Sequence, residues 1–238
     1  MVSAIIVAAG KGIRMNAGIR KQYLHLGGEP ILVRTVKVFS GCPSIREIWL
    51  VVPADDMDDC LEMVHGHPEI STPVHVVAGG KSRQESVCRG LIAMGDHMDS
   101  EDLVAVHDAV RPMISRHHIE LCISSAEKTG ASILAVPVSE TVKQVDADTG
   151  RISRTLERES LWLAQTPQIF KYRILRDAHE KAISEGIEVT DDAMMMEMQN
   201  IPVQIVAGDP KNIKITTPDD LALGEAILGR NENGSRDL

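Results

Sequence analysis

Near its start the chain reads Ala4-Ile5-Ile6-Val7-Ala8-Ala9-Gly10-Lys11-Gly12-Ile13-Arg14-Met15, and Lys21 follows shortly after. The apolar run is rich in β-branched residues and too short for an independent helix, so it predicts a buried strand leading into a glycine-rich loop. Gly10 and Gly12 let backbone N–H groups converge on an anion. The pattern predicts a polyphosphate-binding loop; a glycine-rich turn with merely solvated cations is the alternative.

Two common phosphate-binding loops do not match this segment. A Walker A loop needs Gly-Lys-Ser/Thr, but Lys11 is followed by Gly12. A dinucleotide-binding fingerprint needs a small residue where Met15 stands, because helix and strand approach closely there. Both are therefore disfavoured.

Composition limits the possible classes of protein. The chain has 238 residues, enough for one large α/β domain that buries about 70% of its unfolded surface. Its net charge of −9 argues against a general affinity for nucleic acid or anionic membranes. No segment is long enough to span a membrane. Four cysteines without CxxC spacing, at positions 42, 60, 88 and 122, predict reduced thiols and a cytoplasmic location.

Strand and helix patterns alternate along the first part of the chain. After the first strand, further strands are predicted over 47–52, 74–77, 103–106 and 133–138, and helices begin near Pro30, Met57, Arg83 and Ile119. This alternation requires crossover connections, hence an α/β fold with a doubly wound, mostly parallel sheet. Ligands bind such sheets at the carboxyl ends of the strands.

The pattern changes after Pro137. Residues 141–145 and 151–155 alternate in polarity around a turn over 146–150, which predicts a β-hairpin. A lone hairpin is marginally stable, so it must pack on its own domain or on a second subunit. Helices are then expected over 172–185, after a Thr190 cap, and from Thr217 and Pro218. We expect one domain over 1–230, with an arm inserted at 137–160, and a flexible tail over 231–238.

Six motifs, in order along nearly the whole chain, resemble those of sugar-phosphate nucleotidyltransferases, and most closely the cytidylyltransferases that act on methylerythritol phosphate. The first is the Ala8 to Met15 loop with Lys21-Gln22-Tyr23. The others are Gly79-Gly80-x-x-Arg83-x-x-Ser86-Val87, Val106-His107-Asp108-Ala109-Val110-Arg111-Pro112, Thr166-Pro167-Gln168, Thr190-Asp191-Asp192-Ala193 and Asn212-Ile213-Lys214-Ile215-Thr216.

The resemblance implies a reaction and its partners. The substrates would be CTP and 2-C-methyl-D-erythritol 4-phosphate, and the products 4-diphosphocytidyl-2-C-methyl-D-erythritol and pyrophosphate, in the non-mevalonate isoprenoid pathway. It also implies a Rossmann-like nucleotidyltransferase fold and a homodimer, because the arm of this family embraces a second subunit.

Site residues follow from the resemblance, position by position. Arg14 and Lys21 would stabilise charge on the α-phosphate. The nucleotide would be bound by Ala8, Ala9, Gly10, Lys11, Gly12, Gly80, Lys81 and Ser86. Lys81 departs from members that carry an acidic residue there, which leaves base selectivity open if that side chain takes part.

Asp108 follows a predicted strand and would lie at the ligand edge of the sheet. A carboxylate beside a triphosphate suits Mg²⁺; an ion pair with Arg111 is the alternative. The resemblance assigns the second substrate to Arg111, Thr141, Arg158, Thr190, Lys214 and Thr216. Thr141 and Arg158 belong to the arm, so a partner subunit would supply them.

Three other functions share some of these sequence features. Ribitol 5-phosphate cytidylyltransferase shares many of the motifs, but Leu156-Glu157-Arg158 and Ala8-Ala9-Gly10 favour methylerythritol phosphate. A non-catalytic nucleotide-binding protein should lack Asp108 or the Arg14 and Lys21 pair, and this chain keeps all three. A dinucleotide oxidoreductase would need a small residue in place of Met15.

Overall fold

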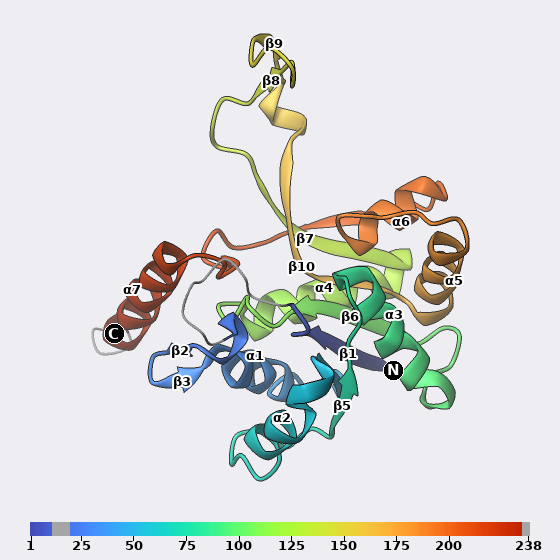
Figure 1. Ribbon diagram of the computed structural model, residues 1–238, viewed down its shortest axis with the longest axis vertical. Coiled ribbons are helices and arrows are strands. Elements are labelled where there is room, and N and C mark those ends of the chain that lie inside the picture. The colour runs from blue at the N-terminus through green and yellow to red at the C-terminus, as the bar shows by residue number, and fades with distance from the viewer. Residues whose placement is uncertain (11–19, 235–238) are drawn as a thin grey trace.

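A seven-stranded sheet forms the centre of the molecule (Figure 1). The computed structural model describes residues 1–10 and 20–234. The strand order is β11-β7-β10-β6-β1-β4-β5. The strands are β1 (Val2–Val7), β4 (Ile45–Val52), β5 (Val74–Ala78), β6 (Leu103–Asp108), β7 (Ala131–Pro137), β10 (Trp162–Lys171) and β11 (Gln204–Ala207). Every neighbouring pair is parallel except those of β10, so the predicted mostly parallel sheet is confirmed.

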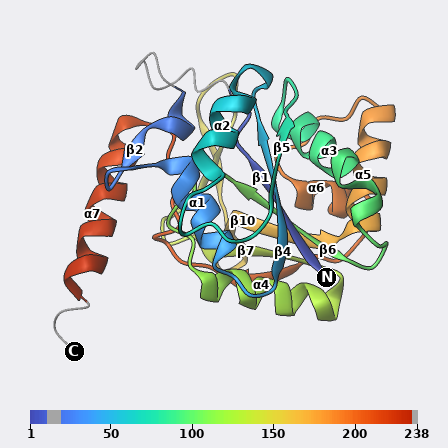
Figure 2. The ribbon, with the colours of Figure 1, turned by 90° about the horizontal axis from the view of Figure 1, so that it is seen from below.

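Helices cover both faces of the sheet (Figure 2). Side chains of α1 (Ile31–Ser40), α2 (Met57–Val64) and α4 (Arg116–Thr129) pack in one core cluster, and those of α3 (Arg83–Met94), α5 (Tyr172–Ser184) and α6 (Asp192–Met198) in the other. Strand β1 serves both clusters because successive side chains point to opposite faces. Ala4 and Ile6 enter the first cluster and Ile5 enters the second.

Helix ends follow ordinary capping chemistry, with one correction to the sequence analysis. Ser82 caps α3 by accepting a hydrogen bond from the Glu85 N–H, and Ser115 caps α4. Asp191, and not Thr190, caps α6: its carboxylate accepts from the Met194 N–H at 3.0 Å. The neighbouring Asp191 side chain meets the free N–H groups, whereas the Thr190 hydroxyl is directed to the Met194 sulfur.

Strands β10 and β11 were missed by the sequence analysis. Strand β10 runs antiparallel between β6 and β7, and its register shifts between Ala164 and Gln168. Gln165, Thr166 and Pro167 interrupt its apolar pattern, and the Thr166–Pro167 peptide is cis. Buried polar residues and a proline mask a strand from periodicity arguments.

The predicted hairpin forms β8 (Lys143–Val145) and β9 (Ile152–Thr155), and the turn η5 (Arg158–Ser160) follows. This arm projects away from the body (Figure 1). Val145 and Ile152 on it are 53% and 64% exposed. Apolar side chains thus remain open to solvent within this single chain.

The last helix, α7 (Pro218–Gly234), packs beside the small hairpin of β2 (His25–Leu26) and β3 (Glu29–Pro30). It extends four residues into the predicted 231–238 tail. The 1–230 domain boundary stays a prediction. Positions 235–238 lie outside the described residues. No described helix is long and apolar enough to cross a membrane.

Candidate active site

The carboxyl ends of the parallel strands β6, β1, β4 and β5 lie at one edge of the sheet. Ala8 follows β1, Gly79 follows β5, and Asp108 ends β6. The Ala8 and Gly79 N–H groups donate to Val51 and Val52 at the end of β4, both at 2.7 Å. The carboxyl ends of β1, β4, β5 and β6 thus hold the loops together, as doubly wound folds require.

The loops that follow β1 and β5 are in close contact. A Cβ atom built on Gly79 would lie 2.2 Å from the Ala9 Cβ and 3.2 Å from the Val52 carbonyl oxygen. No side chain fits at that point, so glycine is required for the approach of the two loops. Ala9 and Gly80, from these two loops, both line a cleft.

The cleft brings together many of the predicted site residues. It is lined by Val7, Ala8, Ala9, Gly10, Lys21, Gln22, Gly80, Lys81, Ser82, Arg83, Ser86, Asp108, Val110 and Lys214. Arg14, Lys11 and Gly12 lie outside the described residues. Lys21 and Asp108, assigned from separate motifs, therefore share a cleft.

Asp108 is the electrostatic centre of this cleft. Its side chain is only 8% exposed, and three cations surround it. Arg83 Nε lies 3.0 Å from Oδ1, Lys214 Nζ 2.7 Å from Oδ2, and Arg111 Nε 3.8 Å from Oδ2. Burial alone would raise the pKa of Asp108, but Arg83 and Lys214 hold that pKa well below its ordinary value. The carboxylate is ionised, as a metal ligand must be.

His107 and Thr166 fix the backbone on which Asp108 sits. The Asp108 N–H donates to the Thr166 hydroxyl, which in turn donates to His107 Nδ1 at 2.9 Å. Since the Arg111 carbonyl can only accept, His107 Nε2 carries the proton in their 3.2 Å contact. Burial lowers the pKa of His107 to about 3, so the ring is neutral.

Backbone and hydroxyl groups of the loop after β5 already make hydrogen bonds within the chain. The Ser86 hydroxyl accepts from the Gly80 N–H at 3.1 Å and donates to the Ser82 carbonyl at 2.7 Å. The Lys81 N–H donates to Glu85 at 2.7 Å. Ser86 therefore has one acceptor site left and no donor.

Residues predicted for the second substrate are dispersed. Lys214 lines the cleft and Arg111 borders Asp108. Thr190 bonds Met194, and Thr216 bonds Asp220 at the start of α7; neither lines the cleft. Thr141 and Arg158 lie on the arm, where Arg158 donates to the Ser139 carbonyl at 3.1 Å. The single chain does not bring the arm residues into the cleft.

Among the lining residues that were not assigned as site residues from the sequence, Gln22 and Arg83 make side-chain contacts that shape the cleft. Gln22 is 1% exposed and donates to the Ala8 carbonyl at 2.8 Å. Arg83 bridges Asp108 and Asp192. Both residues belong to motifs that carry the family resemblance, and this membership is the sequence signal that could have identified them as site residues.

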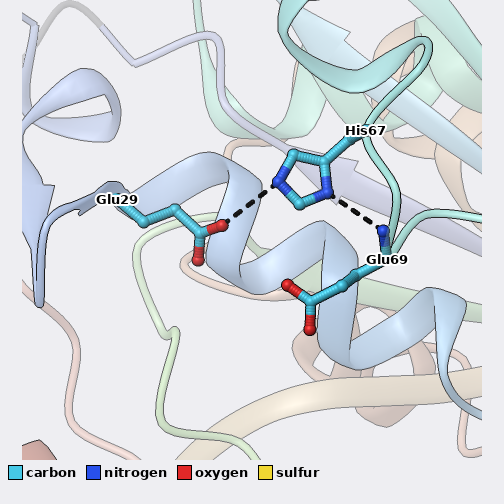
Figure 3. Close-up of side chains that lie close together, drawn as sticks. All are labelled: Glu29, His67 and Glu69. Carbon is cyan, nitrogen blue, oxygen red and sulfur yellow. Dashed lines mark hydrogen bonds and ion pairs between the residues drawn. The ribbon is translucent and has the colours of Figure 1, made fainter.

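A second group of possible metal ligands lies outside the cleft. Glu29, His67 and Glu69 place one ligand atom each within 4.8 Å of one another (Figure 3). Lys37 Nζ lies 3.0 Å from Glu29 and also pairs with Glu69. An added cation would meet the ammonium charge, so we interpret the group as an ion-pair network.

Comparisons with known proteins show the family of the chain. The model of the 2-C-methyl-D-erythritol 4-phosphate cytidylyltransferase family matches residues 2–230. This chain belongs to that family. A curated member from Geobacter metallireducens is 45% identical over 230 residues, which are 95% of this chain and 97% of the relative.

Solved structures extend the likeness to three dimensions. A 4-diphosphocytidyl-2C-methyl-D-erythritol synthase from Anaerococcus prevotii superposes with a TM-score of 0.85 at 33% identity, covering 97% of this chain and 96% of that one. The Francisella tularensis 2-C-methyl-D-erythritol 4-phosphate cytidylyltransferase gives 0.78 at 35%, covering 93% and 96%. The chain is thus a nucleotidyltransferase that transfers the cytidylyl group of CTP to 2-C-methyl-D-erythritol 4-phosphate. Ribitol 5-phosphate is not favoured as the acceptor.

Proposed function

We propose that the cleft around Lys21, Asp108 and Lys214 is the active site of this cytidylyl transfer. The observation that carries the proposal is the convergence of these three charged residues, from three separate family motifs, at the carboxyl ends of the strands. A carboxylate flanked by cations suits a reaction between a triphosphate and a sugar phosphate.

The reaction needs no nucleophile from the protein. A phosphate oxygen of methylerythritol phosphate attacks the α-phosphorus of CTP and forms the new P–O bond. The bond from that phosphorus to the bridging oxygen breaks, and pyrophosphate leaves with the electron pair. The protein's contribution is alignment and charge stabilisation. Lys21 and Arg14 are the proposed donors to the charge on the α-phosphate.

Ser86 has a proposed role in reading the base. Its hydroxyl proton is used by the Ser82 carbonyl, so it can only accept from a ligand. The exocyclic amino group of cytosine is a donor, whereas uracil presents a carbonyl at the same position. The acceptor on Ser86 matches the amino group of cytosine and would face another acceptor on uracil, which supports CTP over UTP as the substrate. We assign nucleotide contacts also to Ala8, Ala9, Gly10, Lys11, Gly12, Gly80 and Lys81.

A magnesium ion is proposed at Asp108. One carboxylate together with phosphate oxygens and water is an ordinary Mg²⁺ ligand set, and the ion would neutralise triphosphate charge and orient it for in-line attack. The Asp108 carboxylate fits such an ion once the Lys214 ammonium moves away from Asp108 Oδ2. Its side chain is 40% exposed and can turn to the phosphate of the second substrate. Arg111, Thr190 and Thr216 are the other proposed substrate contacts in the same subunit.

We propose a homodimer in which the arm supplies Thr141 and Arg158 to the partner's cleft. This rests on the family resemblance and is supported by the projecting arm with its exposed Val145 and Ile152. A cytoplasmic location is proposed as well, supported by four free, buried cysteines.

A turnover assay tests the proposal. Pyrophosphate release is measured with CTP and either methylerythritol phosphate or ribitol 5-phosphate, and UTP replaces CTP in a parallel series. We expect turnover with CTP and methylerythritol phosphate, and much less with either replacement. Preferential use of ribitol 5-phosphate would overturn the substrate assignment, and equal use of UTP would overturn the role of Ser86.

A further inference from the structure

Arg83 stands between the cleft and the interior of the protein. Its Nε donates to Asp108 Oδ1 at 3.0 Å and its Nη1 to Asp192 Oδ2 at 2.7 Å. Nη2 is buried and finds no hydrogen-bond partner among the described residues. One guanidinium thus joins the proposed metal ligand to a second carboxylate that does not line the cleft.

Asp192 is a rigid anchor for that guanidinium. It is fully buried, and its Oδ1 lies 3.1 Å from Nε2 of the buried His179. Its backbone N–H, with that of Ala193, donates to Gln168 Oε1 at 3.0 and 3.1 Å. The start of α6 is therefore fixed to β10, and Asp192 with it.

The three cations around Asp108 differ in how easily they can leave. Lys214 is a flexible, 40% exposed side chain on Oδ2, and Arg111 is distant from that oxygen at 3.8 Å. Arg83 is held at two points and contacts Oδ1. A cation arriving at Asp108 can displace Lys214 from Oδ2 while Arg83 stays on Oδ1.

We infer that Arg83 is a positioning residue of the reaction: anchored by Asp192, it fixes Oδ1 of Asp108 and so leaves Oδ2 for the divalent cation that accompanies the nucleotide. The inference rests on the proposed function of the cleft. Outer partners of metal-binding carboxylates orient the ligand, and their loss typically weakens metal binding about 10- to 100-fold.

The test measures how strongly Mn²⁺ increases the affinity for CTP. Calorimetry gives the CTP dissociation constant with Mn²⁺ and with EDTA, without the second substrate, so that no turnover occurs. The ratio of the two constants reports coupling between metal and nucleotide. Arg83→Lys keeps the charge but replaces the planar fork, which contacts Asp108 and Asp192 through two separate nitrogens, with a single ammonium nitrogen. Asp192→Asn removes the negative charge of the anchor and leaves the residues that line the cleft unchanged. We expect the ratio to fall at least about tenfold in both variants.

Arg176→Gln is the control, because Arg176 is an exposed arginine on α5 paired with Glu180; its ratio should equal that of the wild type. A purely structural role for Arg83 would weaken CTP binding in both buffers and leave the ratio unchanged. If Arg83→Lys does not fold, Asp192→Asn decides alone. A wild-type ratio in a folded Asp192→Asn overturns the inference, whereas absence of any Mn²⁺ effect in the wild type overturns the proposed metal site itself.

Discussion

Gln22 Nε2 donates to the Ala8 carbonyl oxygen at 2.8 Å, and both side chains are buried. Gln22 directly follows Lys21, so this bond ties the segment that carries the proposed catalytic lysine to the end of β1. The bond joins two parts of the same motif on either side of the 11–19 segment.

Gln22→Ala should therefore lower turnover by up to about 10²-fold, because a small displacement of Lys21 misaligns it with the α-phosphate. The unpartnered Ala8 carbonyl should also cost about 1–3 kcal/mol of unfolding free energy. Steady-state kinetics and urea unfolding measure the two effects. Gln199→Ala, which removes a side-chain bond to a carbonyl at the end of α6, is the control and should retain wild-type kinetics.

Gly79→Ala should disrupt the cleft, because its Cβ would lie 2.2 Å from the Ala9 Cβ and 3.2 Å from a backbone oxygen. We expect a loss of about 1–3 kcal/mol in stability and a raised KM for CTP. Gly229→Ala in α7 meets nothing within 4 Å and should be neutral or slightly stabilising. Equal behaviour of the two variants in thermal melts would show that the loops do not pack as described.

The two-subunit site can be tested by mixing variants. Lys21→Ala alone should lower turnover about 10²–10³-fold, and Arg158→Ala should also be impaired. In a heterodimer one site would contain both substitutions and the other neither. Random assortment makes half of the dimers heterodimers, so about a quarter of wild-type activity should return if the C₂ sites act independently. If mass spectrometry confirms the heterodimer and activity stays low, Arg158 does not act across the interface.

Acid should destabilise the protein through His107. Burial lowers the pKa of this histidine from 6.5 to about 3, so between these values the unfolded chain takes up a proton that the folded chain does not. The contribution of the neutral ring to the free energy of unfolding is complete above pH 6.5. It declines as the pH falls toward 3, by up to about 1.4 kcal/mol per pH unit. Urea unfolding at pH 7.5 and 5.0 should show a smaller loss for His107→Gln than for the wild type. An equal loss would exclude this residue as the cause.

Sequence patterns predicted the parallel half of the fold well, because β1, β4, β5 and β6 are apolar runs separated by amphipathic helices. Strand β10 escaped prediction since Gln165, Thr166 and Gln168 are buried and use their polar groups inside the protein. Periodicity cannot register buried polar residues whose partners are distant in sequence.

The site was predictable only in part. The Asp108 position at the end of a strand follows from the chain order, but its contacts with Arg83 and Lys214 join residues 25 and 106 positions away. Local sequence patterns do not distinguish Arg83 from the other arginines as a site residue. Only the fold shows that Asp192, far along the chain, contacts it. Whether Thr141 and Arg158 complete a partner's cleft likewise stays a prediction, because one chain does not place them there.

The most direct test of the central claim is the Mg²⁺ dependence of pyrophosphate release by Asp108→Asn, with CTP and methylerythritol phosphate. The exposed Asp177→Asn on α5 is the matched control. Loss of the carboxylate should reduce turnover by at least about 10²-fold and abolish the response to Mg²⁺, while Asp177→Asn behaves as the wild type. A folded Asp108→Asn that keeps the wild-type Mg²⁺ response would contradict the account and reduce Asp108 to an ion-pair partner of Arg83, Arg111 and Lys214.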